Sequence, residues 1–315
     1  MKVSIIIPAY NELACIPPLI KELDEFLKDR KDYEVIIVDD GSTDGTGSKV
    51  KEYLGTRPWL RMASHKKNMG KTEAIQTGYE VSSGDTIVIF DADLQYDTKD
   101  IPKLIAMVDK GYDVVCGRRI GYYEKKAVSQ IYFWLARKLF NIPIHDLNAM
   151  KALKREIIDS ITMRKDWHRF IVPLAYEAGF RVGEVGVTLR PRRYGKPKYS
   201  SPFRILVGFF DLLAVKFQQS FLKKPMLYFG IMGTGSILLG VLVGIIAIIL
   251  RIFGIGFRPL LYLVILLILA GLLLFVLALI GETSANIIDH LNRIEKRMEK
   301  KGFDDKRDSN NIIGS

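Results

Sequence analysis

Residues 86–95 read Thr-Ile-Val-Ile-Phe-Asp-Ala-Asp-Leu-Gln. The first five are β-branched or apolar, and such a short continuous run is typical of a strand buried inside a sheet. Polar residues follow at once, at Asp91, Asp93 and Gln95. Side chains at positions i and i+2 of an extended chain point the same way. The stretch therefore predicts a buried strand that delivers two carboxylates and an amide to one place.

The same order, a buried strand and then a helix, repeats on both sides of this stretch. Apolar strands are expected at residues 2–8, 33–38, 86–90 and 113–116, and helices at residues 16–28, 46–54, 71–81 and 101–110. Strands that alternate with helices predict an α/β fold with a mostly parallel sheet and helices on both faces. Ligands of such sheets bind at the carboxyl ends of the strands.

Other polar clusters also fall at these carboxyl ends. Tyr10 and Glu12 follow the first strand, and Asp39 and Asp40 end the second. A carboxylate of the Asp39–Asp40 pair suits hydrogen bonding to a ribose or a base edge. A capped turn is an equal alternative, because the glycine, serine and threonine that follow are turn residues.

Asp91, Asp93 and Gln95 form a candidate site for a hard divalent cation. Mg²⁺ and Mn²⁺ prefer oxygen ligands and are often shared with substrate phosphates. A solvated loop is the alternative. Two carboxylates at the end of a buried strand make a poor core, however, so we expect Mg²⁺ or Mn²⁺ as a cofactor.

Two long apolar runs, residues 226–250 and 260–280, lie in the C-terminal third of the chain. Each is long enough to cross a bilayer as a helix, which takes about 20 apolar residues. The connector at residues 251–259 is so short that the two helices must form a hairpin. The runs predict an integral membrane protein with two spans, and a site held beside lipid favours a lipid substrate.

The formal net charge of +11 is unevenly placed. Lys216, Lys223 and Lys224 precede the first run and residues 293–301 are rich in Lys and Arg, whereas the connector carries only Arg251 and Arg258. The positive-inside rule therefore places the first domain and both termini in the cytoplasm. Anionic headgroups account for basic charge beside the spans. We expect membrane lipid as a partner, and no nucleic acid.

Two further segments are amphipathic, residues 127–140 and 203–222. Helices of this type can lie in the headgroup plane of a membrane. For residues 127–140, packing on the domain core is an equal alternative. For residues 203–222 the membrane interface is favoured, because the segment leads directly into the first span.

The expected organisation is a catalytic domain at residues 1–202, a juxtamembrane helix at 203–224, a membrane hairpin at 225–281, and a basic C-terminal helix and tail at 282–315. The first span contains Gly230, Gly233, Gly235 and Gly240. Small residues allow helices to pack closely. They serve either the hairpin itself or a homo-oligomer.

Several motifs together resemble those of the inverting family 2 glycosyltransferases of GT-A fold. They are PAYNE at residues 8–12, VDDGS at 38–42, NMGK at 68–71 and DADLQ at 91–95. Three more resemble the polyprenyl-phosphate glycosyltransferases in particular, the dolichol-phosphate mannose synthases and their bacterial glucosyl relatives. These are DLNAMK at residues 146–151, WHRF at 167–170 and PRRYGKPKY at 191–199.

The resemblance covers nearly the whole chain and implies a GT-A, Rossmann-like fold. It implies inverting transfer of a hexose from UDP-glucose or GDP-mannose to the phosphate of a polyprenyl or dolichyl phosphate. Both donors remain open, with UDP-glucose slightly favoured by His168, Arg169 and Phe170. The product would be a β-linked lipid-phosphate sugar.

The resemblance also implies donor-side roles for matching positions. Pro8, Tyr10, Glu12 and Asp40 would hold the nucleoside, and Asp39 and Lys71 would also bind the donor. The phosphates would lie near Arg193, Lys196 and Lys198, and the sugar near His168 and Arg169. Asp91, Asp93 and Gln95 would hold the metal and the diphosphate. The basic loop departs from the family pattern at Pro197, where serine is common. A solvated surface turn is the alternative for this loop.

On the acceptor side, Arg118 or Arg119 would meet the lipid phosphate. Lys125 and Ser129 match the family's basic residue and serine at the same phosphate, and their spacing puts them on one helix face. Lysine here replaces the more usual arginine, which keeps the charge but loses bidentate geometry. Asp146 would orient the acceptor site or cap a helix.

Two other functions remain alternatives. A processive glycan-elongating synthase needs a Gln-x-x-Arg-Trp motif, and no tryptophan follows Trp167. A membrane adaptor or lipid translocator without catalysis would not need the acidic positions, all of which are intact. The two apolar runs also contain no carboxylate and no basic residue, so they offer no evident transport path.

Overall fold

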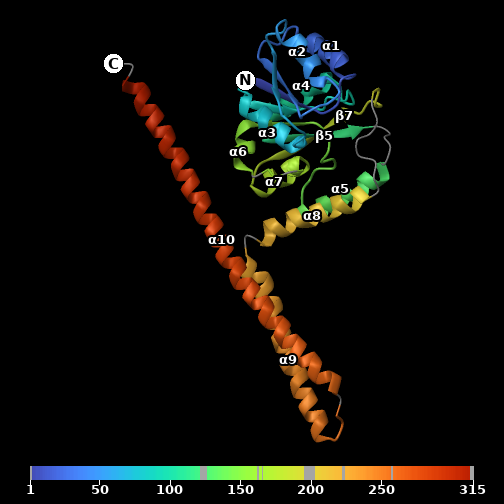
Figure 1. Cartoon of the computed structure of the whole chain (residues 1–315), viewed down its shortest axis with the longest axis vertical. Helices are drawn as coiled ribbons and strands as arrows, with labels where there is room; N and C mark the ends of the chain where they lie inside the picture. The colour runs from blue at the N-terminus through green and yellow to red at the C-terminus, as the bar shows by residue number, and fades with distance from the viewer. Residues whose placement is uncertain are drawn as a thin grey trace. The chain divides into compact units, whose positions relative to one another are not determined.

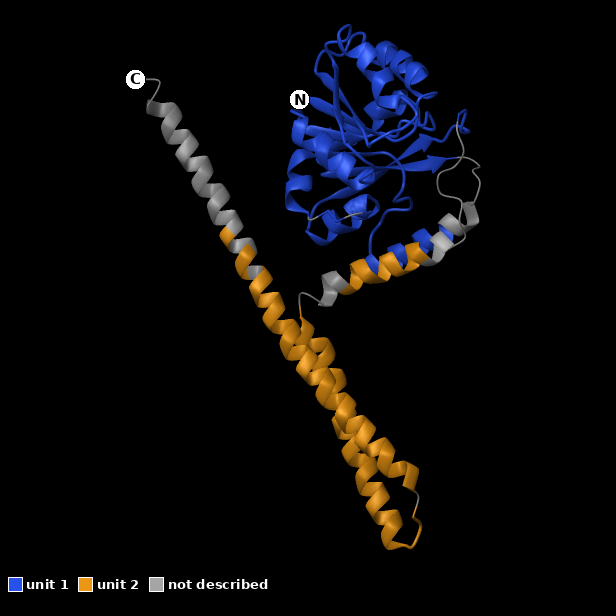
Figure 2. Cartoon of the chain, in the orientation of Figure 1, with its two compact units in different colours: residues 1–204 blue, residues 205–315 orange. Residues whose placement is uncertain are grey.

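The computed structural model describes residues 2–120, 126–161, 163–164, 166–194, 203–221, 224–256 and 258–312, without the side chains of 126–129, 203–206, 218–221, 289, 292–293 and 295–312. The chain divides into two compact units, Met1–Arg204 and Ile205–Ser315, which Figure 2 colours separately. Each unit has its own architecture.

Unit 1 is built on a 7-stranded sheet. Its strands are β1 (Val3–Ala9), β2 (Tyr33–Asp39), β3 (Leu60–Ser64), β4 (Thr86–Ile89), β5 (Val114–Ile120), β6 (Lys151–Lys154) and β7 (Val182–Thr188). They lie in the order β3-β2-β1-β4-β6-β5-β7. Only β6 is antiparallel, to β4 and to β5. The mostly parallel sheet expected from the sequence is confirmed, but β3, β6 and β7 were not anticipated.

Helices cover both faces of this sheet (Figure 1). The helices of unit 1 are α1 (Ile16–Leu27), α2 (Thr46–Leu54), α3 (Lys71–Val81), α4 (Ile101–Asp109), α5 (Lys126–Phe140), α6 (Arg155–Ser160) and α7 (Ile171–Glu177), with short 3₁₀ turns η1 (Thr98–Asp100) and η2 (Trp167–Phe170). Ile5 and Ile7 of β1 join one buried cluster with α1 and α4. Ile6 points to the other face, where α3 packs so closely that a Cβ on Gly78 would lie 2.4 Å from Ile6 Cγ2.

Unit 2 contains α8 (Phe203–Phe221) except for its first two residues, together with α9 (Pro225–Ile252) and α10 (Arg258–Ile312). The helix α9 and the part Arg258–Ile288 of α10 are long and apolar enough to cross a membrane, with mean hydropathies of 2.5 and 3.5 in their most apolar stretches. Only 6% and 11% of those stretches are buried within the protein. This chain therefore leaves their apolar surfaces uncovered, as a lipid-facing helix requires.

α9 and α10 pack as a hairpin through small residues. A Cβ on Gly233 would lie 2.8 Å from the Gly271 carbonyl oxygen, and one on Gly240 would lie 2.9 Å from Ile268 Cγ1. The backbones of the two helices therefore approach each other closely at these glycines. A Cβ on Gly235 would meet nothing within 4 Å. Gly233 and Gly240 serve the hairpin itself.

Glu34 of β2 is a buried carboxylate in the sheet. Its Oε1 accepts hydrogen bonds from Ser4 Oγ at 2.6 Å, from the Ser83 amide at 2.6 Å and from Ser83 Oγ at 2.8 Å. Burial acts to raise the pKa of this carboxyl, but the hydrogen bonds from Ser4 and Ser83 outweigh it and lower the pKa to about 2. The ionised form of Glu34 therefore stabilises the fold.

Replacing Glu34 by glutamine should destabilise unit 1 at pH 7 by about 2 kcal/mol, because part of this hydrogen-bonded charge is lost. The folded-state pKa lies below the usual value of 4.5. The stabilisation is thus complete above about pH 4.5 and is lost as the pH falls towards about 2. Denaturant unfolding of the wild type and of Glu34→Gln between pH 2 and 7 measures this difference in stability. A difference that stays constant over this range would contradict the assignment.

Candidate functional site

The carboxyl ends of β2, β1 and β4 lie side by side, because these strands are neighbours in that order. Asp39 and Asp40 lie at the end of β2, Tyr10 and Glu12 follow β1, and Asp91 follows β4 closely. The polar clusters singled out in the sequence therefore meet along one edge of the sheet, where a ligand of an α/β fold is expected.

Hydrogen bonds tie the loops after β1 and β2 together. The Asn11 amide donates to Ser42 Oγ at 2.9 Å, and the Thr43 amide donates to Asn11 Oδ1 at 2.8 Å. The Glu12 amide donates to Thr46 Oγ1 at 2.9 Å. Asn11 adopts a positive φ of 50°, which asparagine tolerates better than most residues. This network fixes the backbone that carries Glu12.

Asp40 is buried, and both of its oxygens accept hydrogen bonds. Oδ1 accepts from the Met69 amide at 2.8 Å and lies 2.7 Å from His65 Nδ1, while Oδ2 accepts from the Gly70 amide at 2.9 Å. Asp39 Oδ1 also accepts from a backbone amide, that of Ser42, at 3.1 Å. Asp39 thus makes a contact within the turn, as the capped-turn interpretation predicts, whereas Asp40 contacts the segment before α3. Their contact with a nucleoside stays a prediction.

Lys71 and Arg192 hold the two carboxylates after β4. Lys71, the first residue of α3, pairs through Nζ with Asp91 Oδ1. Arg192 Nη2 lies 2.6 Å from Asp93 Oδ2 and 3.4 Å from Gln95 Oε1. Two cations from distant parts of the chain therefore meet the candidate metal ligands.

Arg192 was not among the residues that the sequence singled out. Arg193, which was, is exposed. Arg192 Nη1 also lies 4.0 Å from Glu12 Oε1, so its guanidinium faces the loop after β1 as well. The sequence did offer a signal for Arg192. It lies two residues after Arg190, with Pro191 between them, and side chains two residues apart in an extended segment point to the same side.

Burial raises the pKa of the Asp93 carboxyl to about 6, and the Asp91 carboxylate raises it next, while Arg192 and Lys71 act in the opposite direction. Further positive charge, such as that of a divalent cation, would stabilise the ionised carboxylates of Asp91 and Asp93. The donor set contains only oxygen, which fits Mg²⁺ or Mn²⁺. No group of three or more His, Cys, Asp or Glu converges among the described residues. Substrate phosphate and water would complete the shell.

Binding of Mn²⁺ to the protein should therefore weaken as the pH falls below about 6. The carboxyl of Asp93 has a raised pKa of about 6, so it is neutral below that pH and charged above it. We expect a loss of up to about tenfold in affinity per pH unit between 6 and 5, because a proton competes with the metal. Titration of metal-free protein with Mn²⁺ at each pH measures it. A flat profile would show that Asp93 is not a ligand.

His168 in η2 is held against the start of α3. Its Nδ1 lies 3.0 Å from Thr72 Oγ1, and its amide donates to the same hydroxyl at 3.3 Å. Thr72 is buried and follows Lys71 directly. The structure thus places His168 beside the helix turn that reaches Asp91, while Arg169 is partly exposed.

Arg119 and Asp146 form a bidentate ion pair in unit 1. Arg119 Nε lies 2.6 Å from Asp146 Oδ2 and Nη2 lies 3.1 Å from Oδ1. Asp146 is only 3% exposed, and its Oδ1 also accepts from the Asn148 amide at 3.0 Å. The expected alternative that Asp146 caps a helix is wrong, because the next helix, α6, begins only at Arg155. Asp146 instead positions Arg119.

Arg118 differs from its neighbour because adjacent residues of a strand point to opposite faces. Its side chain is 56% exposed, and its Nη1 lies 3.5 Å from Glu184 Oε1. His145 Nδ1 lies 2.9 Å from the same oxygen. Of the two arginines proposed for the acceptor phosphate, Arg118 presents the more accessible guanidinium.

Some predicted site residues lie outside the described part of the chain. These are Lys125, Lys196 and Lys198, together with the side chain of Ser129. Pro8 and Tyr10 are described, and both are partly buried at the end of β1.

Lys151 is a buried cation that the sequence analysis noted only as part of a motif. Its Nζ donates to the Ala149 carbonyl at 3.0 Å. Burial lowers the pKa of Lys151, whereas Cys116, Asp91 and Asp146 act to raise it. The lysine therefore interacts electrostatically with Asp91 of the candidate metal site and with Asp146 of the Arg119 pair. The sequence motif identified Lys151, but the burial of this lysine depends on its place in the antiparallel strand β6.

Known proteins and a known protein family resemble this chain in sequence. Residues 4–161 match the model of the family described as Glycosyl transferase family 2. A dodecaprenyl-phosphate galacturonate synthase of Rhizobium johnstonii is 31% identical over 305 residues, which cover 90% of this chain and 88% of the relative. An undecaprenyl-phosphate 4-deoxy-4-formamido-L-arabinose transferase of Pseudomonas fluorescens is 32% identical over 262 residues, which cover 81% of this chain and 75% of the relative.

Solved structures show the same fold. Glucosyl-3-phosphoglycerate synthase from Mycobacterium tuberculosis in complex with UDP matches with a TM-score of 0.56 and 20% identity, over 69% of this chain and 79% of that chain. The complex of that enzyme with Mn²⁺, UDP and phosphoglyceric acid matches with a TM-score of 0.55 and 21% identity, over 67% and 78%. The expected GT-A fold is confirmed.

Proposed function

Because this chain belongs to glycosyl transferase family 2 and is a glycosyltransferase, we propose that it transfers a sugar from a nucleotide sugar to a polyprenyl phosphate. The observation that carries this proposal is the pairing of Asp91 and Asp93 with Lys71 and Arg192 at the carboxyl edge of the sheet. The relatives named as polyprenyl-phosphate sugar enzymes support the acceptor, as does the apolar hairpin of α9 and α10.

The reaction would be a single in-line displacement at the anomeric carbon. An oxygen of the lipid phosphate forms the new bond to that carbon, and the bond to the nucleotide diphosphate breaks with its electron pair. A phosphate monoester has its second pKa near 6, so it is a nucleophile at neutral pH without a strong general base. One displacement inverts the centre, so an α-linked donor gives a β-linked lipid product.

On the donor side, Asp91, Asp93 and Gln95 would hold a divalent metal. When bound, the metal supplies positive charge to the departing diphosphate. Lys71 and Arg192 would leave the carboxylates for the diphosphate oxygens, since both cations already lie at the ligands. These preorganised charges stabilise the leaving group without reorganising water.

On the acceptor side, Arg118 would meet the lipid phosphate, with Lys125 and Ser129 as proposed partners. The site must offset the repulsion between two phosphate-bearing substrates, and cations near the acceptor do so. Arg119, which Asp146 holds in place, would add positive charge near the lipid phosphate without contacting it directly.

We propose that α9 and α10 span the bilayer, with the catalytic unit and both termini in the cytoplasm. The helix α5 supports contact with the headgroup region. Its Phe133 and Ala136 are buried, whereas Ile131 and Trp134, three residues apart, are 68% and 54% exposed. One face of the helix therefore packs on the core of the domain, and we propose that the exposed face lies at the membrane interface.

The test is product formation by the full-length protein in detergent, with undecaprenyl phosphate and Mg²⁺ or Mn²⁺. The donor panel contains UDP-glucose, GDP-mannose, and nucleotide-linked galacturonate and 4-deoxy-4-formamido-arabinose, the sugars in the names of the two relatives. We expect one donor to give an anionic lipid-sugar. Turnover with a glycan acceptor, and none with lipid phosphate, would overturn the proposal in favour of glycan elongation.

Replacing Arg118 by alanine should raise the KM for the lipid phosphate about 10- to 100-fold, because one charge-assisted hydrogen bond to phosphate is lost. The KM for the nucleotide sugar should change less than about twofold, since Arg118 contacts Glu184 and not the metal ligands. Initial rates with each substrate varied in turn measure both.

Arg181→Ala is the matched control. Arg181 is also exposed, but it precedes β7 and so lies at the opposite edge of the sheet. Equal effects of the two substitutions, or an unchanged acceptor KM in Arg118→Ala, would remove Arg118 from the acceptor site.

A further inference from the structure

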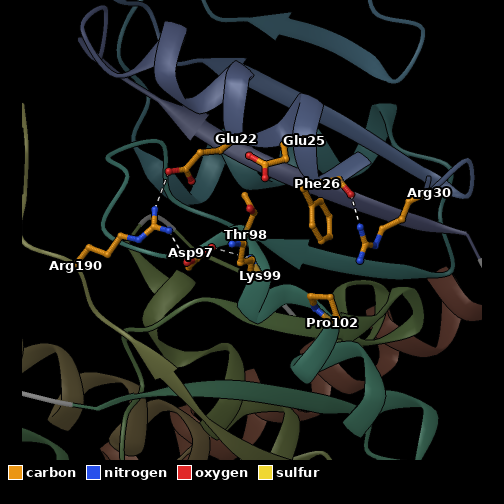
Figure 3. A pocket seen from close by; sticks show the side chains of 9 residues that line it. All are labelled: Glu22, Glu25, Phe26, Arg30, Asp97, Thr98, Lys99, Pro102 and Arg190. Atoms are coloured by element: carbon orange, nitrogen blue, oxygen red, sulfur yellow. Dashed lines mark hydrogen bonds and ion pairs between the residues drawn. The ribbon is translucent and has the colours of Figure 1, made fainter. Parts of the chain in front are cut away.

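Arg190, just after β7, holds two carboxylates from different elements (Figure 3). Its Nη1 lies 2.7 Å from Glu22 Oε1 of α1, and its Nη2 pairs with Asp97 Oδ2 at the start of η1. Its backbone amide donates to the Gln95 carbonyl at 2.7 Å. We call Arg190, Glu22 and Asp97 the Arg190 clamp. The clamp fastens the chain after β7 to α1 and to the loop that carries the metal ligands.

The clamp lies close along the chain to Arg192. Pro191 stands between the two arginines and fixes its own φ near −65°, which stiffens the segment. Arg192 then reaches Asp93 at 2.6 Å and Gln95 at 3.4 Å. Gln95 is therefore held at both of its ends, by the Arg190 amide through its carbonyl and by Arg192 through its side chain.

Arg192 occupies the carboxylate on which a metal would bind. A guanidinium delivered by a fastened segment acts at a high effective concentration, so it competes with a free cation better than a loose side chain would. Loosening the segment should therefore release Asp93. The same loosening would also reduce the time that Arg192 spends where the diphosphate of a donor must arrive.

We propose that the Arg190 clamp is a positioning device that keeps Arg192 on Asp93 in the ligand-free protein and then presents Arg192 to the donor diphosphate. The proposal rests on the proposed function. Arg190, Glu22 and Asp97 are positioning residues, because they touch neither the metal ligands' side chains nor the reacting atoms.

The clamp can be broken without opening the core. It forms part of the wall of a surface cavity of about 330 Å³, lined also by Glu25, Phe26, Arg30, Thr98, Lys99 and Pro102 (Figure 3). Its three side chains are 25%, 27% and 24% exposed. Solvent can therefore take over the polar groups when Arg190 is replaced, and Arg190→Gln should fold.

The experiment measures Mn²⁺ binding to metal-free, full-length protein in detergent without a donor, by the electron paramagnetic resonance signal of free Mn²⁺. Arg190→Gln is expected to tighten Mn²⁺ binding by about three- to tenfold, because a competing cation is less well held. Turnover at saturating metal should fall about tenfold, because Arg192 is misplaced. A merely structural role would weaken metal binding and turnover together.

Arg192→Gln provides the coupling test. Alone it should tighten Mn²⁺ binding at least as much as Arg190→Gln, and in that background Arg190→Gln should add nothing, because the clamp acts through Arg192. Arg57→Gln is the matched control. Arg57 pairs with Asp24 on the same helix α1, with Nε 2.9 Å from Oδ1 and Nη2 2.7 Å from Oδ2, and it should change neither readout.

Three outcomes overturn the proposal and can be told apart. Normal Mn²⁺ binding by the wild type, with the same affinity in Arg190→Gln, overturns the clamp and leaves the proposed function standing. No Mn²⁺ binding by the wild type overturns the metal site and the clamp together. Additive effects of Arg190→Gln and Arg192→Gln would also overturn the clamp, because the two residues would then act independently.

Discussion

Replacement of Asp93 by asparagine should lower kcat by at least about 10³-fold, the largest effect expected for any single substitution in this protein. Asp93 is the more buried of the two carboxylates after β4, and its pKa of about 6 reflects that burial and the neighbouring Asp91. Asparagine keeps the shape but removes the charge that would hold a divalent metal. The rate at which nucleotide diphosphate is released measures the loss of kcat. Titration of the same protein with Mn²⁺ measures the loss of metal binding.

Asp113→Asn is the matched control for Asp93→Asn. Asp113 also carries an ion pair, with Lys154 at 2.7 Å, but it precedes β5 and lies at the amino-terminal edge of the strands. It should leave kcat within about twofold, since it touches no substrate. Full activity of Asp93→Asn with normal Mn²⁺ binding would show that the metal is held elsewhere.

Replacement of Asp146 by asparagine should destabilise unit 1 by about 3–5 kcal/mol, because the bidentate ion pair with Arg119 would be lost from a largely buried site. The pair is bidentate, and both side chains are largely buried, at 14% and 5% exposure. For a unit of this size the loss corresponds to a fall in Tm of roughly 10 °C. Thermal unfolding followed by circular dichroism in detergent measures it.

An exposed ion pair of the same kind provides the comparison. Lys49 and Glu52 of α2 lie 2.7 Å apart on the surface, and Glu52→Gln should change the Tm far less than Asp146→Asn, because solvent screens the exposed pair. A double replacement, Arg119→Met with Asp146→Leu, should be less destabilising than Asp146→Asn, since it removes both charges from the buried site together. If Asp146→Asn kept the wild-type Tm, Asp146 would not position Arg119.

The sequence determined the parts of this protein that depend on neighbours along the chain. A helix at residues 71–81 follows from apolar spacing, and the structure has α3 at Lys71–Val81. Strands at 33–38 and 86–90 follow from short apolar runs, and β2 and β4 occupy nearly those residues. The two apolar runs became α9 and the first part of α10. Local periodicity carries all of this information.

The missed strands show where such local information ends. β6 spans only Lys151–Lys154 and begins with a lysine, so its pattern does not resemble a buried strand. It exists because β4 and β5 flank it and supply hydrogen-bond partners on both sides. β3 is an edge strand that pairs only with β2, and its sequence, LRMAS, is weakly apolar. Pairing with strands that are distant in the sequence therefore determined that both segments form strands.

The candidate site divides in the same way. The sequence alone determined which carboxylates gather at the strand ends, because residue type and strand alternation place Asp91 and Asp93. Only the tertiary structure decided that Arg192 rather than Arg193 meets Asp93, that Asp146 grips Arg119, and that Arg118 stays exposed. The two ion pairs, Arg192 with Asp93 and Arg119 with Asp146, each join residues more than 25 positions apart. Such charges meet only when the sheet brings the two segments together.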